Sequence, residues 1–395
     1  MNFIKKANFT GFLFATFLLL SLSFTVLYKY VLFNHGIHLK YTWLPDIIFF
    51  AIINAILIYK RNYFLILITI LLLLIKSLGS FFVFDFYENR LDYFKEVIKT
   101  VFSFSMVFFI YTYVKNINLS NIVFIFKVFN YVSVIISASI ILGFIFNISF
   151  FETYTGVRFG FSGFLFPQSF SSYFIIVSIL IYYYYNKNIK KISSIYIVFT
   201  ILSAFLIGTK AVYIFLFFFI AMFFINNKLY KNKVAILFSS LVFTILLFNY
   251  KALKEYMLDK FSVLYNVYNE SGLLTFLFSY RDLSFLKAKF YVQNNWNITN
   301  YLFGGINRKA MLVEMELVDI FLSFGILGSV FLLLCYYKII LKPVAFKRDS
   351  FFLYSVLFFI ILMSGNFFKS FTINYFIVFS FVILTYKPKV FTEND

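Results

Sequence analysis

Residues 9–33 read FTGFLFATFLLLSLSFTVLYKYVLF, an almost purely apolar run that decides what kind of protein this is. A helix needs about 20 apolar residues to cross the hydrocarbon of a bilayer, and this run is long enough. It is about twice as long as the apolar part of a secretory signal peptide, and no small-residue cleavage site follows it. We therefore expect it to remain in the mature protein as a first transmembrane helix.

The rest of the chain has the same character. Of its 395 residues, 62% are hydrophobic and 13% are charged, and 64 are Phe. A soluble protein of this length could not bury so much apolar surface, and the apolar runs lack the alternation of barrel strands. The expected fold class is all-α, a polytopic integral membrane protein with about 12 transmembrane helices. They are predicted at approximately 9–33, 44–59, 62–84, 95–114, 121–147, 170–185, 192–209, 211–226, 234–250, 313–337, 351–366 and 372–386.

The short loops predict the orientation of these helices, because cytoplasmic loops carry an excess of Lys and Arg. Basic residues gather on one side, at Lys5, Lys6, Lys60, Arg61, Lys115, Lys187, Lys190, Lys191, Lys228, Lys231, Lys233, Lys338, Lys342, Lys347, Arg348, Lys387 and Lys389. Both termini are therefore predicted to be cytoplasmic. No internal repeat or Pro/Ser-rich linker divides the chain, so residues 1–395 are expected to form a single polytopic membrane domain.

One long stretch is compatible with water. Residues 251–312 are expected to form a large periplasmic or extracellular loop between the ninth and tenth spans, and they carry Lys251, Lys254, Lys260, Arg281, Lys287, Lys289, Arg308 and Lys309. Long loops are exempt from the charge rule, so these cations need another explanation. They could hold the oxygens of a pyrophosphate, or attract anionic lipid headgroups.

Thiol and imidazole chemistry have little support in this sequence. Cys335 is the single cysteine and lies inside a predicted span, which excludes an intrachain disulfide and makes packing its expected role. His35 and His38 are the two histidines, and both lie in the first outer loop. Glu314 and Glu316 could in principle ligate a metal, but no Asp-x-Asp accompanies them. We expect no metal and no cofactor.

Two further outer-face segments carry a cation among glycines. Residues 156–169 read GVRFGFSGFLFPQS and include Arg158, and residues 208–211 read GTKA and include Lys210. Glycines let backbone amides approach an anion closely. The alternatives are that Gly and Pro only shape a turn, and that Lys210 extends its side chain to lipid headgroups.

The predicted tenth span begins with acids. Glu316 and Asp319 are three residues apart and so share a helix face. Carboxylates also stabilise a helix N-terminus by about 0.3–1 kcal/mol, which is the structural alternative to a catalytic role. We expect Asp319 to pair with an outer-face cation, and Glu316 to be more available to a substrate.

Together these segments resemble the O-antigen and capsule repeat-unit polymerases (the Wzy family), which are related to the O-antigen ligases. The resemblance covers the topology of the whole chain, and its motifs are Arg158 with Pro167-Gln168, residues 208–211, and Phe303-Gly304-Gly305 with Glu316 and Asp319. Gln168 and Lys210 stand where Asn and Arg are commoner in the family. Residues 251–320 contain no histidine, whereas the ligases typically have one near the end of the large loop, which favours the polymerase branch.

The resemblance implies a GT-C-like architecture and a glycosyltransferase of the bacterial cytoplasmic (inner) membrane. It would join undecaprenyl-pyrophosphate-linked oligosaccharide units at the outer face, for lipopolysaccharide or other polysaccharide biosynthesis. The implied pyrophosphate-binding residues are Arg158, Lys210, Arg281 and Arg308, and the implied catalytic residues are Arg281, Glu316 and Asp319. The partners are the lipid-linked oligosaccharide, membrane lipids and, as a candidate, a chain-length regulator membrane protein, with no nucleic acid. The alternatives are a flippase for the same lipids, although no paired halves are evident, and an O-antigen ligase.

Overall fold

The computed structural model describes most of the chain. The described residues are 9–37, 63–81, 117–154, 159–165, 168–233, 262–306, 311–338, 348–365 and 371–386, together with residues 48, 51, 52, 54, 55, 58, 59, 61, 101 and 342. The predicted spans at 44–59, 95–114 and 234–250 lie largely or wholly outside them.

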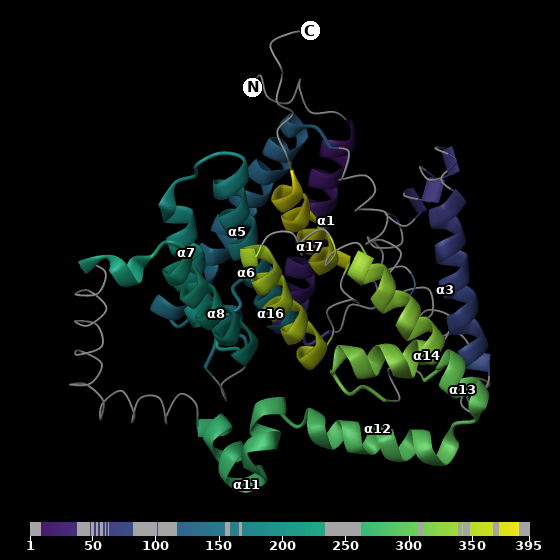
Figure 1. Ribbon diagram of the computed structural model, residues 1–395. Helices are drawn as coiled ribbons and strands as arrows, with labels where there is room; N and C mark the ends of the chain where they lie inside the picture. Colours follow the sequence, from purple (N-terminus) through teal and green to yellow (C-terminus); the bar gives the residue numbers. More distant parts are fainter. Residues whose placement is uncertain are drawn as a thin grey trace.

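Helices make up the regular structure of the described residues (Figure 1). The α-helices are α1 (Phe9–His35), α3 (Tyr63–Phe81), α5 (Leu119–Ile145), α6 (Gln168–Asn188), α7 (Ser194–Leu206), α8 (Lys210–Asn226), α11 (Ser262–Phe278), α12 (Arg281–Asn295), α13 (Ile298–Phe303), α14 (Glu316–Tyr336), α16 (Arg348–Ser364) and α17 (Phe371–Thr385), and the short 3-10 helices are η3 (Ser149–Phe151) and η4 (Leu229–Lys231). The all-α prediction is confirmed for this part of the chain. Nine of the predicted spans coincide with helices, namely α1, α3, α5, α6, α7, α8, α14, α16 and α17.

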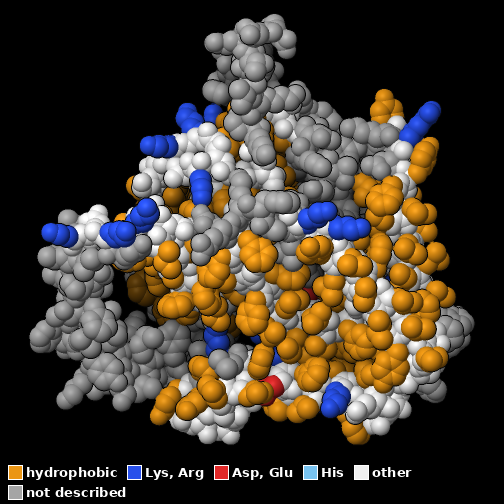
Figure 2. All heavy atoms as spheres, viewed as in Figure 1, with side chains coloured by type: hydrophobic (Ala, Val, Ile, Leu, Met, Phe, Trp, Pro, Cys, Tyr) orange, Lys and Arg blue, Asp and Glu red, His pale blue; other side chains and the backbone are white. Residues whose placement is uncertain are grey.

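The helices have the exterior of a membrane protein. By length and composition, 3 of the described helices can cross a bilayer, in α1, α5 and α14, and shorter apolar helices accompany them. Large apolar side chains lie on the outside, including Leu67 at 63% and Phe217 at 69% exposure. Apolar side chains cover a broad band of the surface in Figure 2. An apolar exterior of this extent is suited to lipid.

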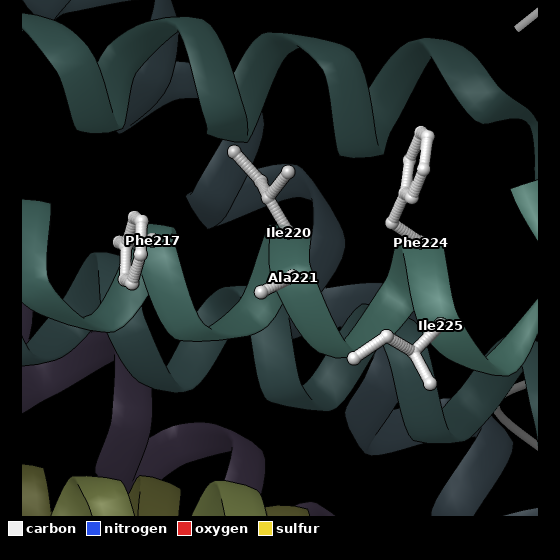
Figure 3. Close-up of a pocket in the computed structure, with 5 residues that line it drawn as sticks. All are labelled: Phe217, Ile220, Ala221, Phe224 and Ile225. Atoms are coloured by element: carbon white, nitrogen blue, oxygen red, sulfur yellow. The ribbon is translucent and has the colours of Figure 1, made fainter. Parts of the chain in front are cut away.

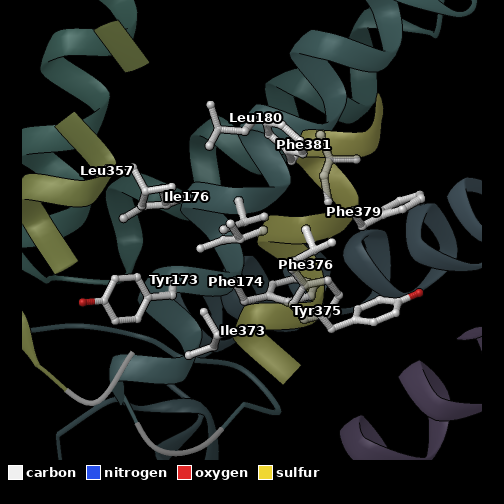
Figure 4. Packing of buried hydrophobic residues seen from close by; sticks show 14 of the residues in the cluster. Tyr173, Phe174, Ile176, Leu180, Leu357, Ile373, Tyr375, Phe376, Phe379 and Phe381 are labelled. Carbon is white, nitrogen blue, oxygen red and sulfur yellow. The ribbon is translucent and has the colours of Figure 1, made fainter. Parts of the chain in front are cut away.

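Helix α6 lies at the centre of the bundle and packs against α7, α8 and α17. Its side chains are buried from Phe170 to Tyr182, because the helix is apolar on nearly every face. Phe174 meets Phe376 of α17 edge-on, with ring centroids 5.1 Å apart (Figure 4). In the same view Tyr173 points away from this aromatic cluster, toward the side on which Leu357 of α16 lies.

The predicted outer loop is largely helical. Helices α11, α12 and α13 all fall within residues 251–312, and α11 and α12 lie across one end of the bundle, away from the first residue of α1 and the last of α17 (Figure 1). The inner face of α12 is anchored by Ala288 and Val292, which pack in a small core with Ile306, Val313 and Leu322. The described part of the loop, residues 262–306, therefore forms three helices, of which α12 packs on a small core.

Helix α14 is broken at Gly325, which has φ 63° and ψ −166°. Figure 1 shows its two segments meeting at an angle. Close to the break, the amides of Gly305 and Ile306 both donate to the Leu322 carbonyl at 3.1 Å. The predicted span over 313–337 coincides with α14, and the structure adds a break within it, because a glycine with a left-handed φ interrupts the helix.

Candidate functional site

The described parts of the two glycine segments, residues 156–169 and residues 208–211, lie against each other. The amide of Phe161 donates to the Leu206 carbonyl at 2.8 Å. Gly208 has φ +75°, and a Cβ there would lie 2.2 Å from the Phe159 carbonyl oxygen. The contact therefore requires glycine. It brings the segment after position 158 against the turn that carries Lys210, although Arg158 itself lies outside the described residues.

Lys210 connects this turn to the end of α11. Its Nζ donates to the Phe276 carbonyl and to Ser279 Oγ, the latter at 3.2 Å, and lies 4.2 Å from the Phe276 ring centroid. The ammonium thus sits at the C-terminal end of α11, where a helix dipole favours a cation. This contact fixes the turn of Ser279 and Tyr280, the two residues that precede Arg281.

Arg281 opens α12 and faces Glu314. Its Nη2 lies 3.3 Å from Glu314 Oε2, and the Arg281 side chain is 24% exposed. In the part of the chain that the structure describes, Arg281 Nε is buried without a hydrogen-bond partner. A guanidinium has five N–H donors, so the group retains donors for an anion that reaches it.

The two predicted acids are both buried, but they have different surroundings. Glu316 is 0% and Asp319 1% exposed. Asp319 Oδ1 accepts a hydrogen bond from the Val313 amide at 3.0 Å, which closes the turn before α14. Glu316 lies within electrostatic range of the hydroxyls of Tyr173 and Tyr336. Asp319 thus stabilises the turn before α14, while Glu316 lies in the electrostatic surroundings of two tyrosine hydroxyls.

Tyr173 is the point at which several elements converge. Its hydroxyl is hydrogen-bonded to Ser364 at the end of α16, and both Glu316 and Arg281 lie within electrostatic range of it. The preceding residue, Ser172, exchanges a hydrogen bond of 2.9 Å with Thr209, next to Lys210. Helices α6, α8, α12, α14 and α16 therefore meet here.

The backbone before Glu316 is fixed by the end of α16. Gly365 has φ +60°, and a Cβ there would lie 2.4 Å from the carbonyl of Glu314. Glu314 itself has φ 61°, a left-handed conformation that is uncommon for a residue with a side chain. Close backbone packing thus constrains the Glu314 main chain, and the Glu314 carboxylate lies 3.3 Å from Arg281 Nη2.

Three buried residues were not predicted as candidates for function. Tyr173 gives no sequence signal, because it is one of 31 tyrosines in the chain. Lys29 in α1 and Lys76 in α3 are buried lysines inside predicted spans. An ionisable residue within a span is a functional-site candidate by default, so the signal for both lysines was present in the sequence.

The remaining predicted residues do not join the cluster in the described structure. Lys287 is exposed on α12, and Arg308 lies outside the described residues. His35 ends α1, and Cys335 is half-buried near the end of α14. Over the described ranges, no three His, Cys, Asp or Glu side chains come together as metal ligands.

A hollow of about 370 Å³ lies elsewhere, along α8 (Figure 3). It is lined by residues of that helix alone, all of them apolar, namely Phe217, Ile220, Ala221, Phe224 and Ile225. A groove of this kind on an apolar exterior suits a lipid chain. It offers no polar group for catalysis.

Comparison of the chain with protein-family models, with curated proteins and with solved structures finds no match.

Proposed function

We propose that this protein is a polysaccharide polymerase, a glycosyltransferase that joins polyprenyl-pyrophosphate-linked oligosaccharide repeat units at the outer face of the bacterial cytoplasmic (inner) membrane. The observation that carries the proposal is that Arg281 and Glu316 both lie within electrostatic range of the Tyr173 hydroxyl. Transfer from a pyrophosphate carrier requires a cation with spare donors and a carboxylate that can take a proton.

In the proposed reaction, a hydroxyl of the incoming unit attacks the anomeric carbon of the growing chain. The bond from that carbon to the pyrophosphate oxygen breaks, and polyprenyl pyrophosphate leaves with the bonding electrons. Arg281 stabilises the charge that develops on the leaving group, and Arg158, Lys210 and Arg308 are proposed to assist it. No nucleotide sugar and no cofactor enter this reaction.

Glu316 is proposed to take the proton from the acceptor hydroxyl. Asp319 is the weaker candidate for the base, because one of its oxygens already accepts the Val313 amide. We assign Asp319 to holding the turn that presents Glu316. Both acids belong to the first turn of α14, so the position of one depends on the other.

Substrate binding is proposed to exchange one anion for another at Arg281. Without substrate, the guanidinium pairs with Glu314, whose side chain is 45% exposed. A partly exposed ion pair contributes little stability, on the order of 0–1 kcal/mol. A pyrophosphate with several acceptor oxygens can therefore displace the Glu314 carboxylate.

The test is to reconstitute the purified protein with undecaprenyl-pyrophosphate-linked repeat units and to separate the products on a gel. A ladder spaced by one repeat supports the proposal. Movement of the labelled lipid between leaflets without a ladder would make the protein a flippase. Transfer of preformed polymer to lipid A, again without a ladder, would make it a ligase.

A further inference from the structure

Aromatic rings and amide side chains lie together where α12 leads into α13 (Figure 1). Residues 293–297 read QNNWN, and Trp296 is one of the 2 tryptophans of the chain. The centroid of its ring lies 5.4 Å from that of Tyr301, which it meets edge-on, and 5.4 Å from that of Phe321 in α14. The small core under α12 thus ends in an aromatic cluster, which we call the α12–α13 corner.

Part of this corner is open to the outside. Tyr301 is 36% exposed, Trp296 is half-buried and Asn295 is exposed. The amide nitrogen of Asn295 donates to the Tyr291 carbonyl at 2.9 Å. An Asn side chain has a second N–H and an acceptor oxygen, so this amide can also bind a ligand. The corner therefore offers ring surface and a hydrogen-bonding group side by side.

Packing alone does not explain a tryptophan at this position. Among the described residues, Trp296 Nε1 is buried without a hydrogen-bond partner, and an unpaired buried donor destabilises the folded state. A phenylalanine would pack against Phe321 without that cost. The indole offers a larger ring surface than phenylalanine does, which is an advantage when the ring also meets a ligand.

Ring surface beside an amide suits a carbohydrate. The C–H groups on one face of a sugar can pack on an aromatic ring, whose own face is electron-rich. The sugar hydroxyls both donate hydrogen bonds and accept them, as an amide does. A lipid chain would make no use of the amide, and an anion is repelled by the face of an aromatic ring.

The corner lies at the opposite end of α12 from Arg281. Arg281, Ala288 and Asn295 follow one another at intervals of seven residues, so they share one face of the helix. The 15 residues of α12 separate the two ends by about 20 Å, at about 1.5 Å per residue. A chain of several sugars can span this distance, whereas a single sugar cannot.

We propose that Trp296, Tyr301 and Asn295 form a subsite for the sugars of the lipid-linked oligosaccharide, while its pyrophosphate lies at Arg281. The proposal rests on the proposed function and names the part of the substrate that the far end of α12 binds. Helix α12 then holds the repeat unit extended between the two ends.

Two ligands with the same carrier test the subsite. The measurement is the Kd of the purified full-length protein for undecaprenyl pyrophosphate and for the undecaprenyl-pyrophosphate-linked oligosaccharide extracted from the cells that make the protein. The wild type should bind the oligosaccharide-bearing lipid more tightly. Trp296→Ala should weaken that binding about tenfold, the scale of one lost aromatic contact, and leave binding of the bare carrier unchanged. Arg281→Ala should weaken both.

Matched variants separate sugar binding from general damage. Phe290 is an aromatic residue of the same helix with 69% exposure, and it is two residues from Ala288, so it lies on the opposite face. Phe290→Ala should bind both lipids as the wild type does. If Trp296→Ala does not fold, Trp296→Phe keeps a ring against Phe321, and Asn295→Ala changes an exposed side chain. Each should weaken binding of the oligosaccharide-bearing lipid alone, by a few-fold.

The outcomes are distinct. Variants at Trp296 and Asn295 that bind the oligosaccharide-bearing lipid as the wild type does would overturn the subsite and leave the proposed function standing. An equal loss of affinity for both lipids in these variants would overturn the subsite as well. A wild-type protein that binds neither lipid would overturn both proposals.

Discussion

Arg281 is the residue on which the proposed chemistry depends most. Its guanidinium is 24% exposed and has a buried Nε without a partner among the described residues. We expect Arg281→Ala to lower polymer formation at least about 100-fold, the scale of a lost charge stabiliser, with an unchanged amount of protein in the membrane. The measurement is the product ladder together with an immunoblot.

Lys289 provides the control, because it is an exposed cation on the same helix. Lys289→Ala should leave the ladder unchanged. Arg158→Ala is predicted to behave as Arg281→Ala does. A normal ladder from both arginine variants would remove these residues from the mechanism.

Replacement of the two buried acids of α14 should have different effects, one on catalysis and the other on stability. Glu316→Gln keeps the shape of the side chain and removes the proposed base, so kcat should fall by about 100-fold or more while the thermal midpoint stays close to that of the wild type. Asp319→Asn replaces the carboxylate that accepts a hydrogen bond from the Val313 amide by a neutral amide. This weaker hydrogen bond should lower the free energy of unfolding by about 1 kcal/mol. Initial rates and thermal unfolding in detergent measure the two effects. If Asp319→Asn lowers kcat and Glu316→Gln lowers the thermal midpoint, Asp319 is the base and Glu316 stabilises the fold.

The site could be predicted only in part from residue types. Lys210, Arg281, Glu316 and Asp319 stand out as charges beside apolar runs, and the structure has both Arg281 and Glu316 within electrostatic range of Tyr173. The contacts of Lys210 with the end of α11 depend on a tertiary fold that the sequence does not reveal. Tyr173 could not be found at all, since its hydroxyl becomes distinctive only where α6 meets Ser364.

Among the helices, the break in α14 allows a prediction about the stability of a variant at Gly325. Gly325 has φ +63°, and a Cβ there would lie 2.4 Å from the carbonyl of Leu302. Gly325→Ala should therefore destabilise the protein through both a strained backbone, which costs about 1–3 kcal/mol, and a backbone collision. We expect a lower thermal midpoint and faster amide exchange in α13 and α14.

Gly272 is the matched control for this prediction. It has φ +83°, but no atom of the described residues lies within 4 Å of the position that a Cβ would take there. Gly272→Ala therefore carries the backbone strain alone. Equal losses of stability in Gly272→Ala and Gly325→Ala would mean that the close contact with Leu302 contributes nothing.

The apolar runs predict helices well and their interruptions poorly. Helices α5 and α8 begin and end within two residues of the predicted spans, because length and hydrophobicity specify a helix in lipid. Helices α11, α12 and α13 were not predicted. In α12, only Ala288 and Val292 are buried in the small local core, which leaves a weak periodic signal. The break at Gly325 was missed because an isolated glycine is tolerated within a helical pattern.

At the scale of the whole molecule, the proposed function requires that α11 and α12 face outward and that the opposite end faces the cytoplasm. The single cysteine of the chain makes this testable. In a Cys335→Ser background, we expect Lys287→Cys on α12 to react with a membrane-impermeant maleimide in cells whose cytoplasmic membrane is intact. Lys228→Cys, beyond the end of α8, should react only after that membrane is permeabilised. Both positions are exposed, so accessibility to the reagent is limited by the bilayer alone. Labelling of Lys228→Cys and not of Lys287→Cys in intact cells would place Arg281 and Glu316 on the cytoplasmic side, where the units to be joined in the proposed reaction are not presented.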